Sequence, residues 1–144
     1  MQSFFTWLDK NKDAEIFLLR LFIGFRLIYA VYAAIFSWNK MLEVGNFFAK
    51  YHLPFPLISA TVSVYAQFLC GILFLLGWKT RYAALLMIIN FSVAWIMVDR
   101  FGTVEDMTPA LAILFCSMLF LFQGPGKISL DRNLSFGREN YKQQ

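Results

Sequence analysis

Four long apolar segments run along the chain, separated by shorter polar stretches. They cover residues 16–38, 56–78, 82–98 and 108–123. The hydrocarbon core of a bilayer is ~30 Å thick, and a helix needs about 20 residues to cross it, with a range of roughly 17 to 25. The first three segments meet this length and the fourth comes close to it. The pattern therefore predicts four transmembrane helices.

The polar stretches predict how these helices begin, end and connect. Thr108 can cap the fourth segment with Pro109 at its first helical position, and the Gly-Pro-Gly at residues 124–126 would end it. Residues 79–81 predict a tight turn between the second and third segments. Residues 39–55 mix apolar and charged positions, which is typical of a short helix lying in the headgroup region.

No alternation with a period of two supports a β-barrel, and lipid leaves only helices or closed barrels as spanning structures. We therefore predict an all-α fold: an integral membrane four-helix bundle with a short interfacial helix between spans one and two, in one domain over residues 1–144. The composition agrees, since 59% of residues are apolar and 15% charged, against roughly 45 to 50% and about 25% in soluble domains.

The cations are distributed unevenly between the two sides of these spans. Eight fall on the side of the termini and three on the other, and cytoplasmic loops carry an excess of Lys and Arg. We therefore expect both termini in the cytoplasm and a multi-pass protein of the inner membrane. The eight are Lys10, Lys12, Lys79, Arg81, Lys127, Arg132, Arg138 and Lys142, and the three are Lys40, Lys50 and Arg100.

Two alternative explanations of the charge and of the first segment are less suitable. The net charge of +4 includes no basic run longer than two residues, so we expect the lipid bilayer and not nucleic acid as a partner. A cleaved signal peptide would need an uninterrupted apolar stretch, whereas Arg20 and Arg26 interrupt the first segment. We expect this segment to be retained as a span.

Ionisable residues within a span are costly and are candidates for function. Arg20 lies near the cytoplasmic start of span one, where its stem can extend back to the headgroups as an anchor. Arg26 lies close to the midplane and shares a helix face with Ala30 and Ala33, small residues that allow another helix to approach. We therefore expect Arg26 to point into the bundle.

Gln67 in span two and Asn90 in span three lie at a similar depth to Arg26, and Tyr29 and Tyr65 could add hydroxyl groups. Two interpretations are open. In the first, the amides only accept hydrogen bonds from Arg26 and fix helix register, and in the second, the five residues form a polar pocket. An arginine without a carboxylate in any span would suit a quinone head group, a lipid phosphate or a water-filled cleft. We predict that Arg26, Gln67 and Asn90 converge.

Cys70 and Cys116 lie at matching depths in spans two and four. Core packing and a redox pair are both compatible with that placement. The two Cys and one His show no zinc spacing, so we expect no metal site. Sequence motifs of hydrolases and nucleotide-binding enzymes are absent, and whether the chain is an enzyme stays open.

Several short segments resemble the DoxX family of small four-span membrane proteins. They are LLRL at residues 18–21, NKM at 39–41, LPFP at 53–56, AQFLCG at 66–71, LGWKTR at 76–81 and GPGKISLD at 124–131. The resemblance implies a four-helix inner-membrane protein. Its better-known relatives are linked to sulfur or quinone redox enzymes and to oxidative-stress assemblies, and others resemble cargo receptors or chaperones.

This chain departs from the family pattern at two positions. Many relatives carry Glu where this chain has Gln67, and often Gly where it has Cys70. Without that carboxylate, proton-coupled chemistry is a poorer expectation. We predict an accessory subunit of a quinone- or sulfur-linked redox or oxidative-stress system that binds another membrane or redox subunit. The alternative is a non-enzymatic membrane chaperone or partner-binding protein. A small transporter is a third hypothesis, and it would require oligomerisation.

The predicted topology can be tested by cysteine labelling in a variant whose native cysteines are replaced by Ala. A membrane-impermeant thiol reagent added to intact cells should label Lys50→Cys and leave Lys142→Cys unlabelled, because residues 39–55 and 99–108 are expected outside. Labelling at position 142 but not at position 50 would reverse the orientation.

Overall fold

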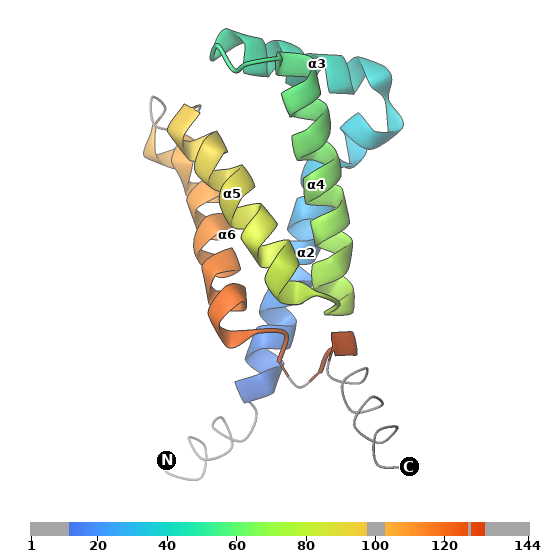
Figure 1. Ribbon diagram of the computed structural model, residues 1–144, viewed down its shortest axis with the longest axis vertical. Helices are drawn as coiled ribbons and strands as arrows, with labels where there is room; N and C mark the ends of the chain where they lie inside the picture. The colour runs from blue at the N-terminus through green and yellow to red at the C-terminus, as the bar shows by residue number, and fades with distance from the viewer. Residues whose placement is uncertain (1–11, 98–102, 127, 132–144) are drawn as a thin grey trace.

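The computed structural model describes residues 12–97, 103–126 and 128–131, and these residues form an all-helical structure (Figure 1). No strand occurs among them, which confirms the predicted fold class. Six of the cations used for the orientation (Lys10, Arg100, Lys127, Arg132, Arg138 and Lys142) lie outside the described residues, as does part of the predicted outer loop at 99–108. The helices are α2 (Lys12–Phe36), α3 (Trp38–Lys50), α4 (Pro56–Leu76), α5 (Thr80–Met97) and α6 (Val104–Gln123).

Three of the described helices contain stretches long and apolar enough to cross a membrane: Ala14–Phe36, Pro56–Leu76 and Thr80–Met97. The apolar part of α6, Met107–Gln123, is somewhat shorter and falls at about the lower limit for a span. Helix α3 lies across one end of the others, as the interfacial helix was predicted to do (Figure 1). The arrangement is that of a membrane helical bundle.

The spanning helices form two pairs, in which α2 packs mainly on α4 and α5 mainly on α6. The first pair crosses at two glycines. A Cβ atom at Gly24 would lie 2.8 Å from the carbonyl oxygen of Gly71, and one at Gly71 would lie 2.9 Å from that of Gly24. Only residues without a side chain allow this approach. Between the pairs, Leu27, Phe74 and Phe120 belong to one buried apolar cluster.

Helix α6 begins earlier than predicted. It starts at Val104, and the amide of Met107 donates to the carbonyl of Thr103 at 3.2 Å, so Thr108 does not cap it and Pro109 lies inside it. A proline this close to a helix start forfeits a single backbone hydrogen bond, and Glu105 in the first turn interacts favourably with the helix dipole. The predicted end is confirmed, since Gly124 follows the last helical residue with φ +78°.

Arg20 is buried, and the prediction that it reaches back to the headgroups is wrong. Its side chain is 1% exposed. Its guanidinium donates to the carbonyl oxygen of Pro125, and to that of Ile128 at 2.9 Å. The Phe17 ring lies 5.8 Å from the guanidinium carbon. A buried guanidinium must have acceptors, and the segment after α6 supplies them as backbone carbonyls.

Gly77, at the end of α4, packs directly against this guanidinium. A Cβ atom there would lie 2.6 Å from one Arg20 nitrogen, and the φ angle of +65° also favours glycine. The amides of Gly77 and Trp78 bond back to the carbonyls of Phe74 and Leu73, at 3.2 and 3.0 Å, which is the pattern of a glycine-terminated helix. The buried guanidinium of Arg20 therefore requires a glycine at position 77, in the turn between α4 and α5.

Asp131 connects the same segment to the start of α5. Its carboxylate accepts from the amides of Lys79 at 2.8 Å and Thr80 at 3.1 Å, and its own amide donates to the Gly77 carbonyl at 3.1 Å. This cap explains why α5 begins at Thr80 and not at residue 82 as predicted. We call the set of Arg20, Gly77, Pro125, Ile128 and Asp131 the Arg20 closure.

Removing the cap should destabilise the bundle. Asp131→Ala leaves the amides of Lys79 and Thr80 without their acceptor, and the expected loss is about 1 to 2 kcal/mol of unfolding free energy. Asp131→Asn, which keeps one acceptor oxygen and loses the charge, should lie in between. Asn46→Ala, at an exposed position within α3, serves as the control. Unfolding in detergent followed by circular dichroism measures the effect, and equal stability of Asp131→Ala and the native chain would contradict it.

Candidate functional site

A cavity of about 550 Å³ lies between α4 and α5, at the end of the bundle covered by α3, and it is open on one side, where lining residues such as Ile58 and Val62 are exposed. Helix α4 contributes side chains between Ile58 and Ala66, and α5 contributes side chains between Leu86 and Met97. Phe48, Leu53 and Pro54 close the end next to α3. The volume falls within the range of about 300 to 1,000 Å³ that is usual for small-molecule sites.

The path of the helices explains the position of this cavity. Helices α4 and α5 are joined by the short turn at Gly77 and diverge from there toward α3 (Figure 1). Near the turn, Phe74, Ala83 and Ala84 are fully or almost fully buried. Farther along, Val62 and Val93 face the cavity. The tight turn thus positions the start of α5, and the divergence leaves the cavity at the other end.

Three polar side chains line the cavity, and only one of them lacks a partner within the described chain. Ser59 donates from its hydroxyl to the Pro54 carbonyl at 2.7 Å. Ser63 accepts a hydrogen bond from the Gln67 side-chain amide at 3.1 Å, and its hydroxyl keeps a proton to donate. Asn90 reaches the cavity from α5, with no hydrogen bond to any described residue. The amide of Asn90 and the hydroxyl of Ser63 are thus available to a ligand.

Arg26 does not belong to this cavity. Its side chain is exposed on α2, so the prediction that it points into the bundle is wrong, and with it the prediction that it converges with Gln67 and Asn90. The buried face of α2 is formed by Gly24, Leu27 and Val31, and the helical repeat of about 3.6 residues places Arg26 away from it. Gln67 and Asn90 remain predicted ligand-binding residues.

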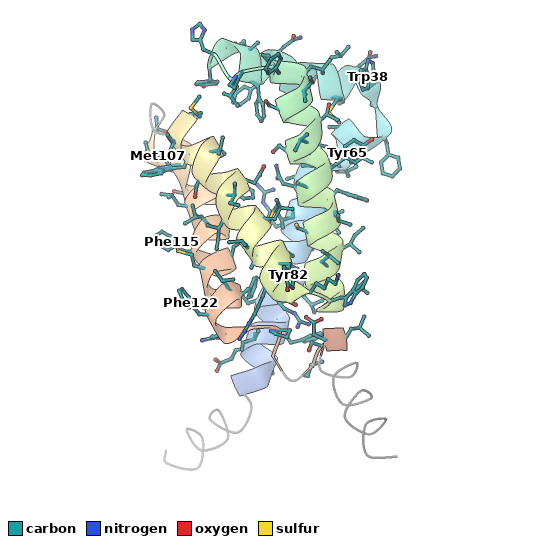
Figure 2. The ribbon with its side chains drawn as sticks, in the orientation of Figure 1. Trp38, Tyr65, Tyr82, Met107, Phe115 and Phe122 are labelled. Atoms are coloured by element: carbon teal, nitrogen blue, oxygen red, sulfur yellow. The ribbon has the colours of Figure 1, made fainter. Side chains whose placement is uncertain are left out.

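The two predicted tyrosines also face outward. The side chains of Tyr29 and Tyr65 are 62% and 54% exposed, and neither lines the cavity. Figure 2 places Tyr65 on the side of α4 away from α5. Tyr29 forms aromatic contacts with Phe25 and Tyr32, at centroid distances of 6.2 and 5.6 Å. Their predicted contribution of hydroxyl groups to an interior pocket is therefore wrong.

Cys70 and Cys116 are free thiols. Cys70 is buried in the central apolar cluster, and Cys116 packs against the same cluster, in which the Phe74 and Phe120 rings lie 5.1 Å apart. This placement accounts for both as packing residues, and the redox pair stays a prediction. Among the residues described, no group of His, Cys, Asp or Glu side chains could hold a metal ion.

Sequence reasoning did not identify Ser63 as a cavity residue. The signal was present, because Ser63 precedes Gln67 by four residues and the two side chains therefore meet on one helix face. Asn90 was selected for its depth in the membrane, and that depth does place it at the cavity. Arg26 was assigned to the wrong side because its small neighbours Ala30 and Ala33 were expected to face the bundle, whereas both Arg26 and Ala30 are exposed.

These features define a helical membrane protein with an apolar cavity between two of its spans. The DoxX family model matches residues 16–100, which include most of α2 and all of α3, α4 and α5, and the chain belongs to the DoxX family. Searches of curated proteins and of solved structures returned no match.

Proposed function

We propose that this DoxX protein is an accessory subunit of a quinone- or sulfur-linked redox or oxidative-stress system. In this proposal it lies in the inner membrane with both termini cytoplasmic, and the cavity between α4 and α5 is its ligand site. The observation that carries the proposal is the Asn90 amide, which has no hydrogen bond to any described residue, in a mainly apolar cavity at membrane depth.

The chemistry of the cavity favours a neutral ligand with a carbonyl oxygen. Its walls are mainly aliphatic, with the Asn90 amide on one side and the Ser63 hydroxyl on the other as donors. A quinone ring presents carbonyl oxygens on a flat apolar frame, and its isoprenoid chain could extend along Val62 and Val93. A lipid acyl chain would fill the apolar space but would leave the Asn90 amide unsatisfied. Because no described residue that lines the cavity is a cation, a phosphate is a poor fit.

The lining suits binding better than chemistry. Among the described residues that line it, none is a carboxylate, imidazole, thiol or amine, so these residues supply no general acid or base. Gln67, where many relatives carry Glu, is hydrogen-bonded to Ser63 and cannot carry a proton as a carboxylate would. This supports an accessory subunit that holds a quinone for an enzyme in another chain.

The alternative function is a membrane chaperone or partner-binding protein. A specific observation favours it, namely the exposed Arg26 side chain within a spanning helix.

The cavity can be tested with a short-chain ubiquinone analogue and isothermal titration calorimetry on the purified full chain. Asn90→Leu should weaken binding about five- to tenfold, because one hydrogen bond to the quinone carbonyl is lost. Ser63→Ala should weaken it by a similar or smaller factor. The matched control is Tyr65→Phe, which removes a hydroxyl outside the cavity and should leave the affinity unchanged. Unchanged affinity in Asn90→Leu, or an equal loss in Tyr65→Phe, would contradict the proposal.

A further inference from the structure

One face of α2 is left uncovered by the rest of the described chain. Phe22, Phe25, Arg26, Tyr29 and Ala30 are all exposed, and they follow one another at the three- and four-residue spacing of a single helix face. The opposite face packs on α4 through Gly24. The exposed face therefore meets either lipid or another protein.

Arg26 lies deep within this span. The spanning stretch is Ala14–Phe36, and at ~1.5 Å per residue Arg26 is roughly 18 Å from one end and about 15 Å from the other. An arginine stem covers only a fraction of that distance, so its guanidinium cannot reach the headgroups as arginines near helix ends do. A cation exposed to hydrocarbon at this depth is among the costliest placements for a side chain.

The described helices offer no counter-charge at that depth. Arg26 makes no ion pair or hydrogen bond to any described residue. The sequences of α4 and α5 contain no Asp or Glu, and the acidic residues of α6 are confined to its first turn. An acceptor for the five donors of Arg26 must therefore come from outside this chain.

The surroundings of Arg26 suit a second helix. Ala30 is exposed one turn further along, and Ala33 is half-buried a turn beyond that. Small residues in this spacing allow a neighbouring helix to approach closely. On the other side, the rings of Phe25 and Tyr29 stack with their centroids 6.2 Å apart and form an apolar border. A cation next to small residues and bordered by aromatic rings resembles the centre of a helix interface.

We propose that the Arg26 face, formed by Phe22, Phe25, Arg26, Tyr29 and Ala30, binds a transmembrane helix of a partner membrane protein that carries an Asp or Glu at mid-depth. A second copy of this chain is a poor occupant, because symmetric pairing would bring two arginines together and no described helix presents a carboxylate at that depth. The inference rests on the accessory role proposed above, because both require a partner protein. It does not depend on which ligand the cavity binds.

The test uses the full chain in phosphatidylcholine vesicles and a synthetic transmembrane helix as the probe. The helix consists of Leu and Ala with one central Glu and a dansyl group, and a matched helix has Gln in place of Glu. Energy transfer from the four tryptophans of the chain reports association. The Glu helix should bind about tenfold more tightly than the Gln helix. Arg26→Leu should abolish this preference, and Arg26→Lys should retain most of it.

Two further variants serve as controls. Phe115→Leu alters an exposed residue on α6 and should keep the preference for the Glu helix. Asn90→Leu should also keep this preference, which separates failure of this inference from failure of the cavity proposal. Equal binding of the two helices, or a preference that survives Arg26→Leu, overturns the inference. It is also overturned if self-association of the chain depends on Arg26, or if added phosphatidylglycerol removes the preference, since Arg26 would then pair with a second copy or with a lipid phosphate.

Discussion

The buried guanidinium of Arg20 is the constraint on which the rest of the fold depends. Its donors need acceptors away from water, and the carbonyls of Pro125 and Ile128 are the ones it uses. The chain must therefore return to α2 after α6. That return brings Asp131 to the amides of Lys79 and Thr80, where it caps α5. The Arg20 closure thus joins the α2–α4 pair to the α5–α6 pair at one end of the bundle.

The closure at one end leaves the other end open. Helices α4 and α5 diverge from the Gly77 turn (Figure 1), and the cavity with Ser63 and Asn90 lies where they are farther apart, beneath α3. The two arginines of α2 point in different directions. Arg20 and Arg26 are six residues apart, which turns a helix by about 600°, so one arginine faces the closure and the other faces outward. Arg20 therefore donates to carbonyls within the chain, and Arg26 leaves its donors for the proposed partner.

The helices could be predicted from the sequence, but the sequence did not reveal which face of each helix packs against its neighbours. The apolar segments and residues 39–55 predicted the spans and the interfacial helix, because length and composition determine whether a segment crosses or lies on a bilayer. The small residues beside Arg26 led to the wrong prediction that Arg26 points into the bundle, because small residues do not reveal which helix approaches. Gly24, which marks the true contact with Gly71, was the better signal. The burial of Arg20 depended on carbonyls more than a hundred residues away, and no local pattern encodes such a contact.

The most direct test of this account is amide hydrogen exchange at Lys79 and Thr80 in the native chain and in Arg20→Met. Arg20 makes no hydrogen bond to these two amides, which donate to Asp131 and are protected by it. If Arg20 holds the segment that carries Asp131, both amides should exchange at least about tenfold faster in the variant, which corresponds to about 1.4 kcal/mol. Amides in the middle of α6 should keep their native rates. Unchanged exchange at Lys79 and Thr80 would contradict the central role of the Arg20 closure.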